Sequence, residues 1–167
     1  DASWSRGLGD VYKRQGRNYN TANVTSANLI TVSGLSITSV AGSNSSAPED
    51  YVLDSTTKTA NATITPKTVS LAVAPKVYDA STNMTGYVSI TTGVGSETLT
   101  YNGATSNDAH VATTGKYLNA ITLGNASDGS GGLASNYQLP ALNVTNAPIT
   151  ITPKTVSLAV APKVYDA

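Results

Sequence analysis

The residues that could carry acid–base or nucleophilic chemistry are few, and three of them lie close together in the sequence. His110 is the only histidine, and Ser106 and Asp108 shortly precede it. A catalytic triad needs a nucleophile within reach of a base that a carboxylate orients, whereas neighbours in one short polar stretch mostly point apart. Without a second histidine or any cysteine, a metal site is equally poorly supplied. We therefore expect no catalytic and no metal-binding residue here, and interpret His110 as a solvated residue at a strand edge.

A glycine-rich loop over residues 125–132 contains Asp128 followed by Gly129, a sequence that invites a calcium site. Calcium takes about six to eight oxygen ligands, usually from several carboxylates. The loop itself offers one carboxylate, so Asp108 or Glu97 would have to approach it in the fold. The sequence favours a plain glycine-rich turn, with calcium as the alternative, and we expect no cofactor.

Two further patterns could indicate sugar chemistry. The nine tyrosines could form a platform for stacking sugar rings, but most lie in strand patterns, where core or sheet-face positions are the simpler interpretation. Asn-X-Ser/Thr triplets could be glycosylation acceptors, although a chain this rich in all three residue types contains them by composition alone. The triplets begin at Asn23, Asn44, Asn61, Asn83, Asn125 and Asn143. The ligand-binding residues stay unknown at this level.

The chain contains an exact internal repeat. Residues 150–167, TITPKTVSLAVAPKVYDA, are identical to residues 63–80. Self-similarity at a fixed period indicates a tandem array, and a unit of this length can bury its own core, unlike a solenoid repeat. We predict that residues 16–67 are the C-terminal half of a preceding unit, residues 68–154 one complete unit, and residues 155–167 the first strand of the next. Residues 64–67, with Pro66, would form a short extended joint.

The two ends of the chain carry their own signals. Residues 10–15, DVYKRQ, resemble the translation of a transposon end used in sequencing libraries, and the residues before them fit no part of the repeat. We therefore expect residues 1–15 to be a non-native leader without a place in either unit. Because the chain stops where the exact repeat stops, we also expect an internal fragment of a larger protein, so the missing signal peptide carries no information about secretion.

Composition excludes several classes of protein. Ten basic and ten acidic residues give a formal charge of zero, which offers no electrostatic footprint for nucleic acid or an anionic membrane. No apolar run approaches the length of a membrane span. Cysteine is absent, so disulfides and thiolate metal sites are unavailable. Abundant Thr, Val, Ile and Tyr favour strands, and Asn, Gly and Ser favour turns, so we predict an all-β chain.

Alternating apolar residues predict the strands of the complete unit. Val69, Leu71 and Val73 alternate with small or polar residues, and residues 156–160 copy that pattern. Further strands are predicted over residues 87–91, 97–101, 110–113, 117–123, 137–139, 142–144 and 149–151, with a hairpin loop at 93–96 and a short helical turn at 81–84. The predicted core comprises Val69, Leu71, Val73, Val88, Ile90, Leu99, Leu118, Ile121 and Tyr137. An immunoglobulin-like sandwich fits this size and spacing, and a β-grasp-like sheet with one short helix is the alternative.

Several short motifs, in this order along the unit, resemble a known bacterial family. They are the TITPK lead-in, the sequence KVYD at residues 76–79 with Ser81-Thr82 after it, and NYQL at residues 136–139; VSGL at residues 32–35 belongs to the partial unit. Together they resemble the YDG-type repeat domain. The family usually has Gly after the Tyr-Asp pair, whereas Ala80 and Ala167 stand here. If that position needs a positive φ, alanine is strained there.

The resemblance implies a place in large secreted or surface-attached bacterial proteins, including haemagglutinin-like adhesins. We therefore predict an extracellular, non-catalytic stalk segment of such an adhesin, with neighbouring repeats of the same chain as partners and a host or bacterial surface ligand as a further one. The alternative is a module of the same architecture that binds a glycan itself, which an exposed cluster of tyrosines beside Asn, Asp or Gln would favour. An enzyme would need a concave pocket with perturbed ionisable groups.

Overall fold

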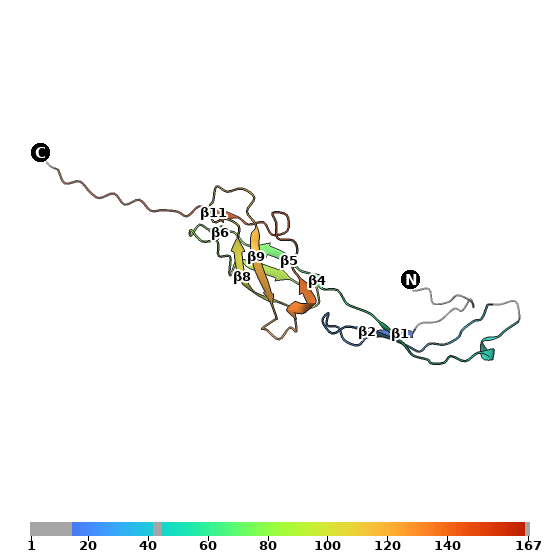
Figure 1. Cartoon of the computed structure of the whole chain (residues 1–167). Helices are drawn as coiled ribbons and strands as arrows, with labels where there is room; N and C mark the ends of the chain where they lie inside the picture. Colours follow the sequence, from blue (N-terminus) through green and yellow to red (C-terminus); the bar gives the residue numbers. More distant parts are fainter. Residues whose placement is uncertain (1–14, 42–44, 166–167) are drawn as a thin grey trace. The chain divides into compact units, whose positions relative to one another are not determined.

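The computed structural model of the chain describes residues 15–41 and 45–165 and divides into two compact units (Figure 1). Unit 1 ends at Thr65, and unit 2 begins at Pro66. Within the described residues there are strands and two three-residue 3-10 turns but no α-helix, so the all-β class is confirmed. Residues 1–14 of the predicted leader lie outside the described residues, whereas Gln15 is the first residue of a strand.

Unit 1 is a three-stranded antiparallel sheet in the order β1-β2-β3, with long connections between its strands. Its strands are β1 (Gln15–Tyr19), β2 (Leu29–Ser33) and β3 (Lys58–Asn61). The 3-10 turn η1 (Pro48–Asp50) lies in the connection between β2 and β3. Ala27 is the one apolar residue that is buried among the described residues of this unit. Unit 1 therefore has strands but almost no core.

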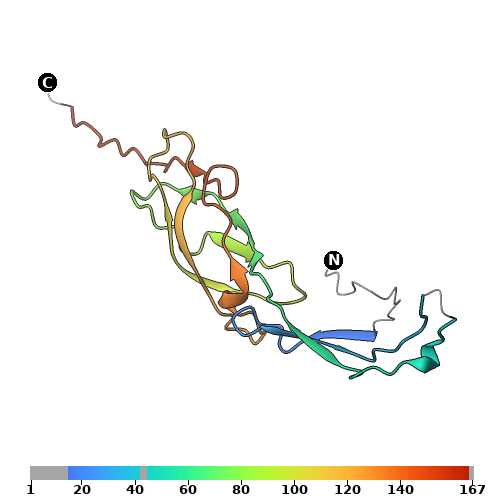
Figure 2. The ribbon, with the colours of Figure 1, turned by 45° about the vertical axis from the view of Figure 1, so that its right-hand side comes forward.

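Unit 2 contains four pairs of strands (Figure 2). Two pairs are antiparallel, β5 with β7 and β8 with β9, and two are parallel, β4 with β10 and β6 with β11. The parallel pairs join the beginning of the unit to its end. The strands are β4 (Lys67–Thr68), β5 (Ser70–Val73), β6 (Lys76–Val77), β7 (Val88–Thr91), β8 (Thr100–Ser106), β9 (Leu118–Gly124), β10 (Tyr137–Gln138) and β11 (Ile151–Thr152), with η2 at Ala134–Asn136.

One hydrophobic core connects these pairs. Met84, Ala104, Leu118 and Ala147 are fully buried at its centre, and partly buried residues of β5 pack against them. The predicted alternation along β5 is correct, because Leu71 and Val73 face the core and Ala72 faces solvent. Of the predicted core, Val69, Val88, Leu118, Ile121 and Tyr137 are buried, whereas Leu71, Val73, Ile90 and Leu99 are only half-buried.

The predicted hairpin between residues 87–91 and 97–101 is wrong. The turn at residues 93–96 does form, since the Glu97 amide donates to the Val94 carbonyl. Its flanking strands nevertheless pair elsewhere: β7 pairs with β5, and β8 begins only at Thr100 and pairs with β9. A local turn signal fixes a change of direction, whereas the choice of partner depends on which faces the distant strands can bury.

Two predicted strands and the predicted helical turn are also wrong. Residues 110–113 and 142–144 lie in turns, because side chains there bond to backbone groups and offset the β propensity of Val111 and Val144. Both valines are exposed. Residues 81–84 form no helix; Asn83 instead makes an isolated bridge to Thr105. The last predicted strand, 149–151, is observed as Ile151–Thr152.

Leu118 offers a direct test of this core. Its side chain is completely buried, so Leu118→Ala should lower the free energy of unfolding of unit 2 by about 2–5 kcal/mol. Thr122→Ala, on the exposed face of the same strand, should cost less than about 1 kcal/mol. Urea unfolding followed by circular dichroism measures both. Equal effects of the two substitutions would contradict the assigned faces of β9.

Candidate functional site

Ser106, Asp108 and His110 do come together, but as a turn. The Ser106 hydroxyl is buried and donates to the Asp108 carbonyl at 2.7 Å, and the Asp108 carboxylate accepts from the His110 backbone N–H at 2.5 Å. That backbone hydrogen bond is the main cause of the lowered pKa of Asp108. The His110 ring instead stacks on Tyr78, with centroids 6.3 Å apart. The three side chains shape a loop rather than forming a proton relay.

The most deeply buried ionisable side chain among the described residues is a lysine whose burial the sequence did not predict. Lys76 is 2% exposed, and its ammonium donates to the Ser81 carbonyl at 2.9 Å and the Asn83 carbonyl at 2.8 Å. The Asp79 carboxylate lies 2.8 Å away, and this interaction holds the pKa of Asp79 below its ordinary value. A buried ammonium is tolerated only when oxygens replace its hydration shell. Lys76 therefore fixes the turn that follows β6.

That same turn contains strained backbone. Ala80, directly after Asp79, has φ +63°, a left-handed conformation that alanine adopts at a cost. The condition raised by the sequence is thus met, because this position does need a positive φ. Asp79 closes the turn by accepting from the Ser81 backbone N–H at 3.0 Å. The KVYD motif accordingly acts as a structural anchor, with its strain at the residue where the resembling family has glycine.

Ala80→Gly should stabilise unit 2. Relief of the left-handed strain exceeds the extra chain entropy of glycine, so the free energy of unfolding should rise by about 0.5–1 kcal/mol. Ala72→Gly is the matched control, because Ala72 lies exposed in the extended β5 and glycine there should destabilise by about 0.5–1 kcal/mol. The urea midpoint reports both changes. A loss of stability on Ala80→Gly would rule out strain at this turn.

The glycine-rich loop is tied to the chain before β8 by its single carboxylate. Asp128 accepts from the Thr98 hydroxyl at 2.7 Å and from the Ser130 backbone N–H at 3.0 Å. These donors, led by Thr98, lower the pKa of Asp128 to about 2. A Cβ at Gly132 would overlap the Thr98 carbonyl oxygen, so glycine permits this close approach. Protein donors thus engage both carboxylate oxygens.

The carboxylates that the calcium alternative requires are not brought together. Glu97 accepts from the Tyr137 hydroxyl at 2.5 Å, and Asp108 is engaged in its own turn. In the part of the chain that the structure describes, no group of three or more His, Cys, Asp or Glu side chains could hold a metal ion. The geometry of the loop matches the glycine-rich turn.

The lowered pKa of Asp128 predicts that unit 2 loses stability in acid over a defined pH range. This folded-state pKa of about 2 lies below the ordinary 3.8, so between these values the unfolded chain binds a proton that the folded chain excludes. The stabilisation is complete above about pH 4 and is lost as the pH falls through 2. The thermal midpoint of unit 2 should drop in that window, and Asp128→Asn should show a smaller drop. Thr98→Val, which removes the first donor, should flatten the profile likewise; unchanged profiles for both variants would exclude this role.

Four described tyrosines of unit 2 pack into or against its core, and Tyr117 is half-buried and bridges to Pro148. Burial, aided by the bond to Glu97, raises the pKa of Tyr137. Tyr78, Tyr87 and Tyr101 pack against the core, and the Tyr101 hydroxyl accepts from the Gly86 backbone N–H at 2.8 Å. The more exposed tyrosines with assigned exposure are Tyr19, Tyr51 and Tyr165. The first two belong to unit 1.

Three of the six Asn-X-Ser/Thr asparagines bond through their side chains to nearby backbone groups. Asn83, Asn125 and Asn143 each accept a backbone N–H with the side-chain oxygen. Asn61 lies exposed at the end of β3, and Asn44 falls outside the described residues. The local role of Asn in turns explains the three bonded positions without a glycosylation site.

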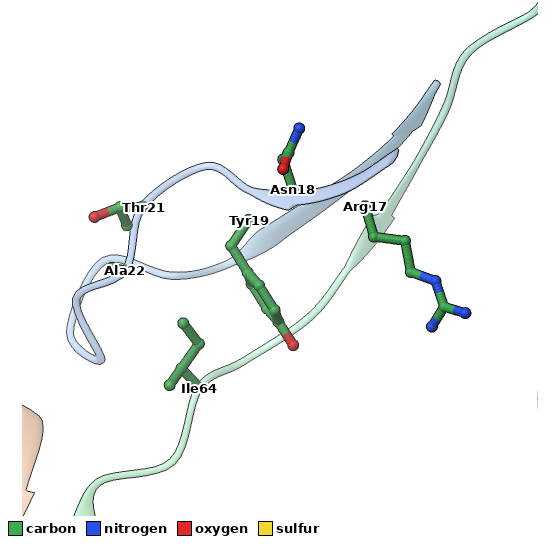
Figure 3. A pocket seen from close by; sticks show the side chains of 6 residues that line it. All are labelled: Arg17, Asn18, Tyr19, Thr21, Ala22 and Ile64. Carbon is green, nitrogen blue, oxygen red and sulfur yellow. The ribbon is translucent and has the colours of Figure 1, made fainter. Parts of the chain in front are cut away.

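Unit 1 has two open hollows. The first has a volume of about 330 Å³, and Figure 3 shows the side chains that line it. The second, of about 290 Å³, includes Tyr51 and Val52. The first hollow has one exposed tyrosine, Tyr19, beside polar side chains, whereas the glycan alternative calls for a cluster of exposed tyrosines. It is lined by Arg17, Asn18, Tyr19, Thr21, Ala22 and Ile64.

Shared hydrogen bonds show which positions of the two units correspond. In unit 1, Asn20 donates its backbone N–H to the Leu29 carbonyl and accepts the Leu29 N–H with its side chain at 3.2 Å. In unit 2, Asn107 does the same with Tyr117, at 2.9 Å for the side-chain bond. The connection from β1 to β2 therefore matches that from β8 to β9.

The later parts of the units match as well. Tyr51 follows η1 and donates to the Pro48 carbonyl, as Tyr137 follows η2 and donates to the Ala134 carbonyl. Ile64 corresponds to Ile151 through the exact repeat. Tyr137 and Ile151 are both buried, whereas Tyr51 is 40% exposed and Ile64 half-buried. Both hollows thus lie at positions that a complete unit covers.

Comparisons with protein-family models, with curated proteins and with solved structures find no match for this chain. Of the described residues, none belongs to a helix with the length and apolar character needed to cross a bilayer.

Proposed function

We propose that this chain is a stalk segment of a large bacterial cell-surface or secreted adhesin, built from tandem β-units that carry no catalysis. The observation that supports it is that the repeated sequence contains both the end of one unit and the start of the next. Its first residues, Ile151–Thr152, end unit 2 as β11, and the residues that follow Pro153 repeat β4, β5 and β6. One unit therefore passes into the next across a single proline, without a flexible linker. Such a joint suits a stiff series of beads.

The KVYD anchor supports membership of the YDG-type repeats. In this proposal Lys76 and Asp79 are characteristic of the family because they build the turn after β6. The glycine that usually follows the Tyr-Asp pair in the family is favoured by the positive φ found at Ala80. The motif then marks a requirement of the fold rather than a binding site. The repeated copy at residues 163–167 would build the same turn in the next unit.

For the unit itself we propose an immunoglobulin-like sandwich. Two antiparallel pairs share one core, and strands from the two ends of the unit pair in parallel, which suits a sandwich closed by its terminal strands. A β-grasp-like sheet would need a helix packed on it, and the described residues of unit 2 offer only η2.

The second candidate is a glycan-binding module, favoured by Tyr19 beside Arg17 and Asn18 in the first hollow of unit 1. The correspondence between the units weighs against it. Tyr19 matches Ser106, and both Ser106 and Ile151 are buried in unit 2. A hollow that closes in the complete unit would be lost along an intact array.

Scattering from chains with one, two and three copies of residues 66–152 tests the stalk. Each unit has its own core and the joint is short, so the maximum dimension should grow nearly in proportion to the number of units. Growth of a compact particle instead would mean that units pack side by side, and would contradict the stalk. As a control, lengthening the joint with several Gly-Ser residues should broaden the distribution of dimensions.

Glycan binding by these chains and by the full 167-residue chain distinguishes the alternative. A stalk unit should show no saturable binding to host or bacterial glycans at about millimolar concentration. Saturable binding by the full chain that Tyr19→Ala abolishes would instead support the glycan module. Tyr165→Ala serves as the matched control, because Tyr165 is an exposed tyrosine that does not line this hollow.

A further inference from the structure

The first strands of unit 2, β4 and β6, are bonded in parallel to its last strands, β10 and β11. In the first of these ladders, the Val69 backbone N–H donates to the Gln138 carbonyl at 3.0 Å. In the second, the Lys76 backbone N–H donates to the Thr150 carbonyl at 3.0 Å, and a bond of 2.9 Å from the N–H of Tyr78 extends this ladder. Backbone hydrogen bonds thus join the beginning of the unit to its end at two places.

Parallel pairing decides how these bonds are loaded when the chain is pulled. Tension reaches unit 2 at Pro66, before β4, and leaves it at Pro153, after β11. Figures 1 and 2 show β4 and β11 at opposite ends of this unit. Within each parallel ladder, one strand is pulled from its N-terminal end and the other from its C-terminal end, so the two strands must slide past each other and all the bonds are loaded together. An antiparallel pair pulled from one end loses its bonds one after another.

The buried ammonium of Lys76 keeps β6 from following β11 under such a load. It donates to the Ser81 carbonyl at 2.9 Å and to the Asn83 carbonyl at 2.8 Å, and Asn83 bridges to Thr105 of β8. A side chain that is 2% exposed therefore connects β6 to the turn after it and, through that turn, to β8. Water would compete for a stretched hydrogen bond at the surface, but it has little access to this one.

We propose that unit 2 bears tension along the chain through a shear clamp, which consists of the two parallel ladders and the Lys76 ammonium that anchors β6. As a role, bearing tension rests on the proposed stalk function, because a stalk passes the load from one unit to the next through its joints. The clamp itself consists of bonds within one unit and needs no contact between units. It also gives the buried lysine a purpose that an apolar residue at this position would not serve.

Pulling the full 167-residue chain in two directions tests the clamp. The chain has no cysteine, so Thr65→Cys with Lys154→Cys places handles at two exposed positions on either side of unit 2. Ser70→Cys with Thr91→Cys places them on an exposed facing pair at one end of the antiparallel ladder between β5 and β7. At equal force, unfolding should be at least about tenfold slower between the first pair, because several bonds worth roughly fivefold in rate each must fail together. Equal rates, or faster unfolding between the first pair, would overturn the proposal.

Lys76→Met tests the anchor, with Lys116→Met as the matched control. Lys116 is also buried, but its ammonium donates to the carbonyls of Val111 and Thr113, in a turn outside both ladders. Lys76→Met should reduce the ratio of the two unfolding rates by about fivefold, the loss expected for one hydrogen bond. Lys116→Met should leave that ratio unchanged within about twofold. The ratio cancels any loss of stability that both directions share.

A ratio that Lys76→Met leaves unchanged, or that both variants reduce equally, would remove Lys76 from the clamp. The comparison of the two directions needs neither variant, so it decides the clamp even where a variant fails to fold. Failure of the clamp and failure of the stalk are also distinguishable. Units that extend in scattering but unfold equally fast in both directions would overturn the clamp and keep the stalk. Slow unfolding along the chain in units that pack side by side would contradict the stalk, and with it the role in tension.

Discussion

The parallel pairing between the beginning and the end of unit 2 is the constraint on which the rest of the structure depends. β4 lies beside β10 and β6 beside β11, so the first eleven residues of the fold are held by strands from its last part. The segment between these ladders carries Leu71 and Val73 onto the core and buries Val69. Such contacts are distant in sequence, so the unit closes only when both of its ends are present. The described residues of unit 1 show no such parallel pairing, and they bury one apolar side chain, Ala27.

The buried ammonium of Lys76 is coupled to that closure. β6 offers its backbone to β11, while the Lys76 side chain turns to the Ser81 and Asn83 carbonyls and the Asp79 carboxylate. Three oxygens compensate the lost hydration, which an apolar residue at this position would not require. The turn that brings these acceptors around the ammonium also places Ala80 at a positive φ. The polar anchor and the backbone strain are therefore two consequences of one local geometry.

The sequence revealed the strands of this fold better than their partners. Alternation predicts the buried face of β5, because burial of one face and exposure of the other leave a period of two. The strand at β9 is predicted without clean alternation, and its burial pattern has no period of two, since Leu118 and Ile121 are buried and the two residues between them are exposed. Alternation does not say which strands pair with each other, so the turn at residues 93–96 suggested a hairpin that does not form. The burial of Lys76 was missed for a related reason: lysine usually lies at the surface, and its acceptors are backbone carbonyls, which leave no mark on residue types. The turn that contains Asp128, by contrast, was predicted from its glycine-rich sequence.

The correspondence between the two units determines how exposed surfaces of this chain are interpreted. Tyr19 and Ile64 line a hollow in unit 1, but Ser106 and Ile151, their counterparts in unit 2, are buried. A concave surface with an exposed tyrosine can therefore be an uncovered core rather than a ligand site, and the complete unit within the same chain distinguishes the two. The two copies of the repeated segment are identical, so their own side chains do not distinguish one copy from the other. In the proposed array, proximity would then select the partner of each segment, because the segment that follows a unit would be at a high effective concentration beside the next.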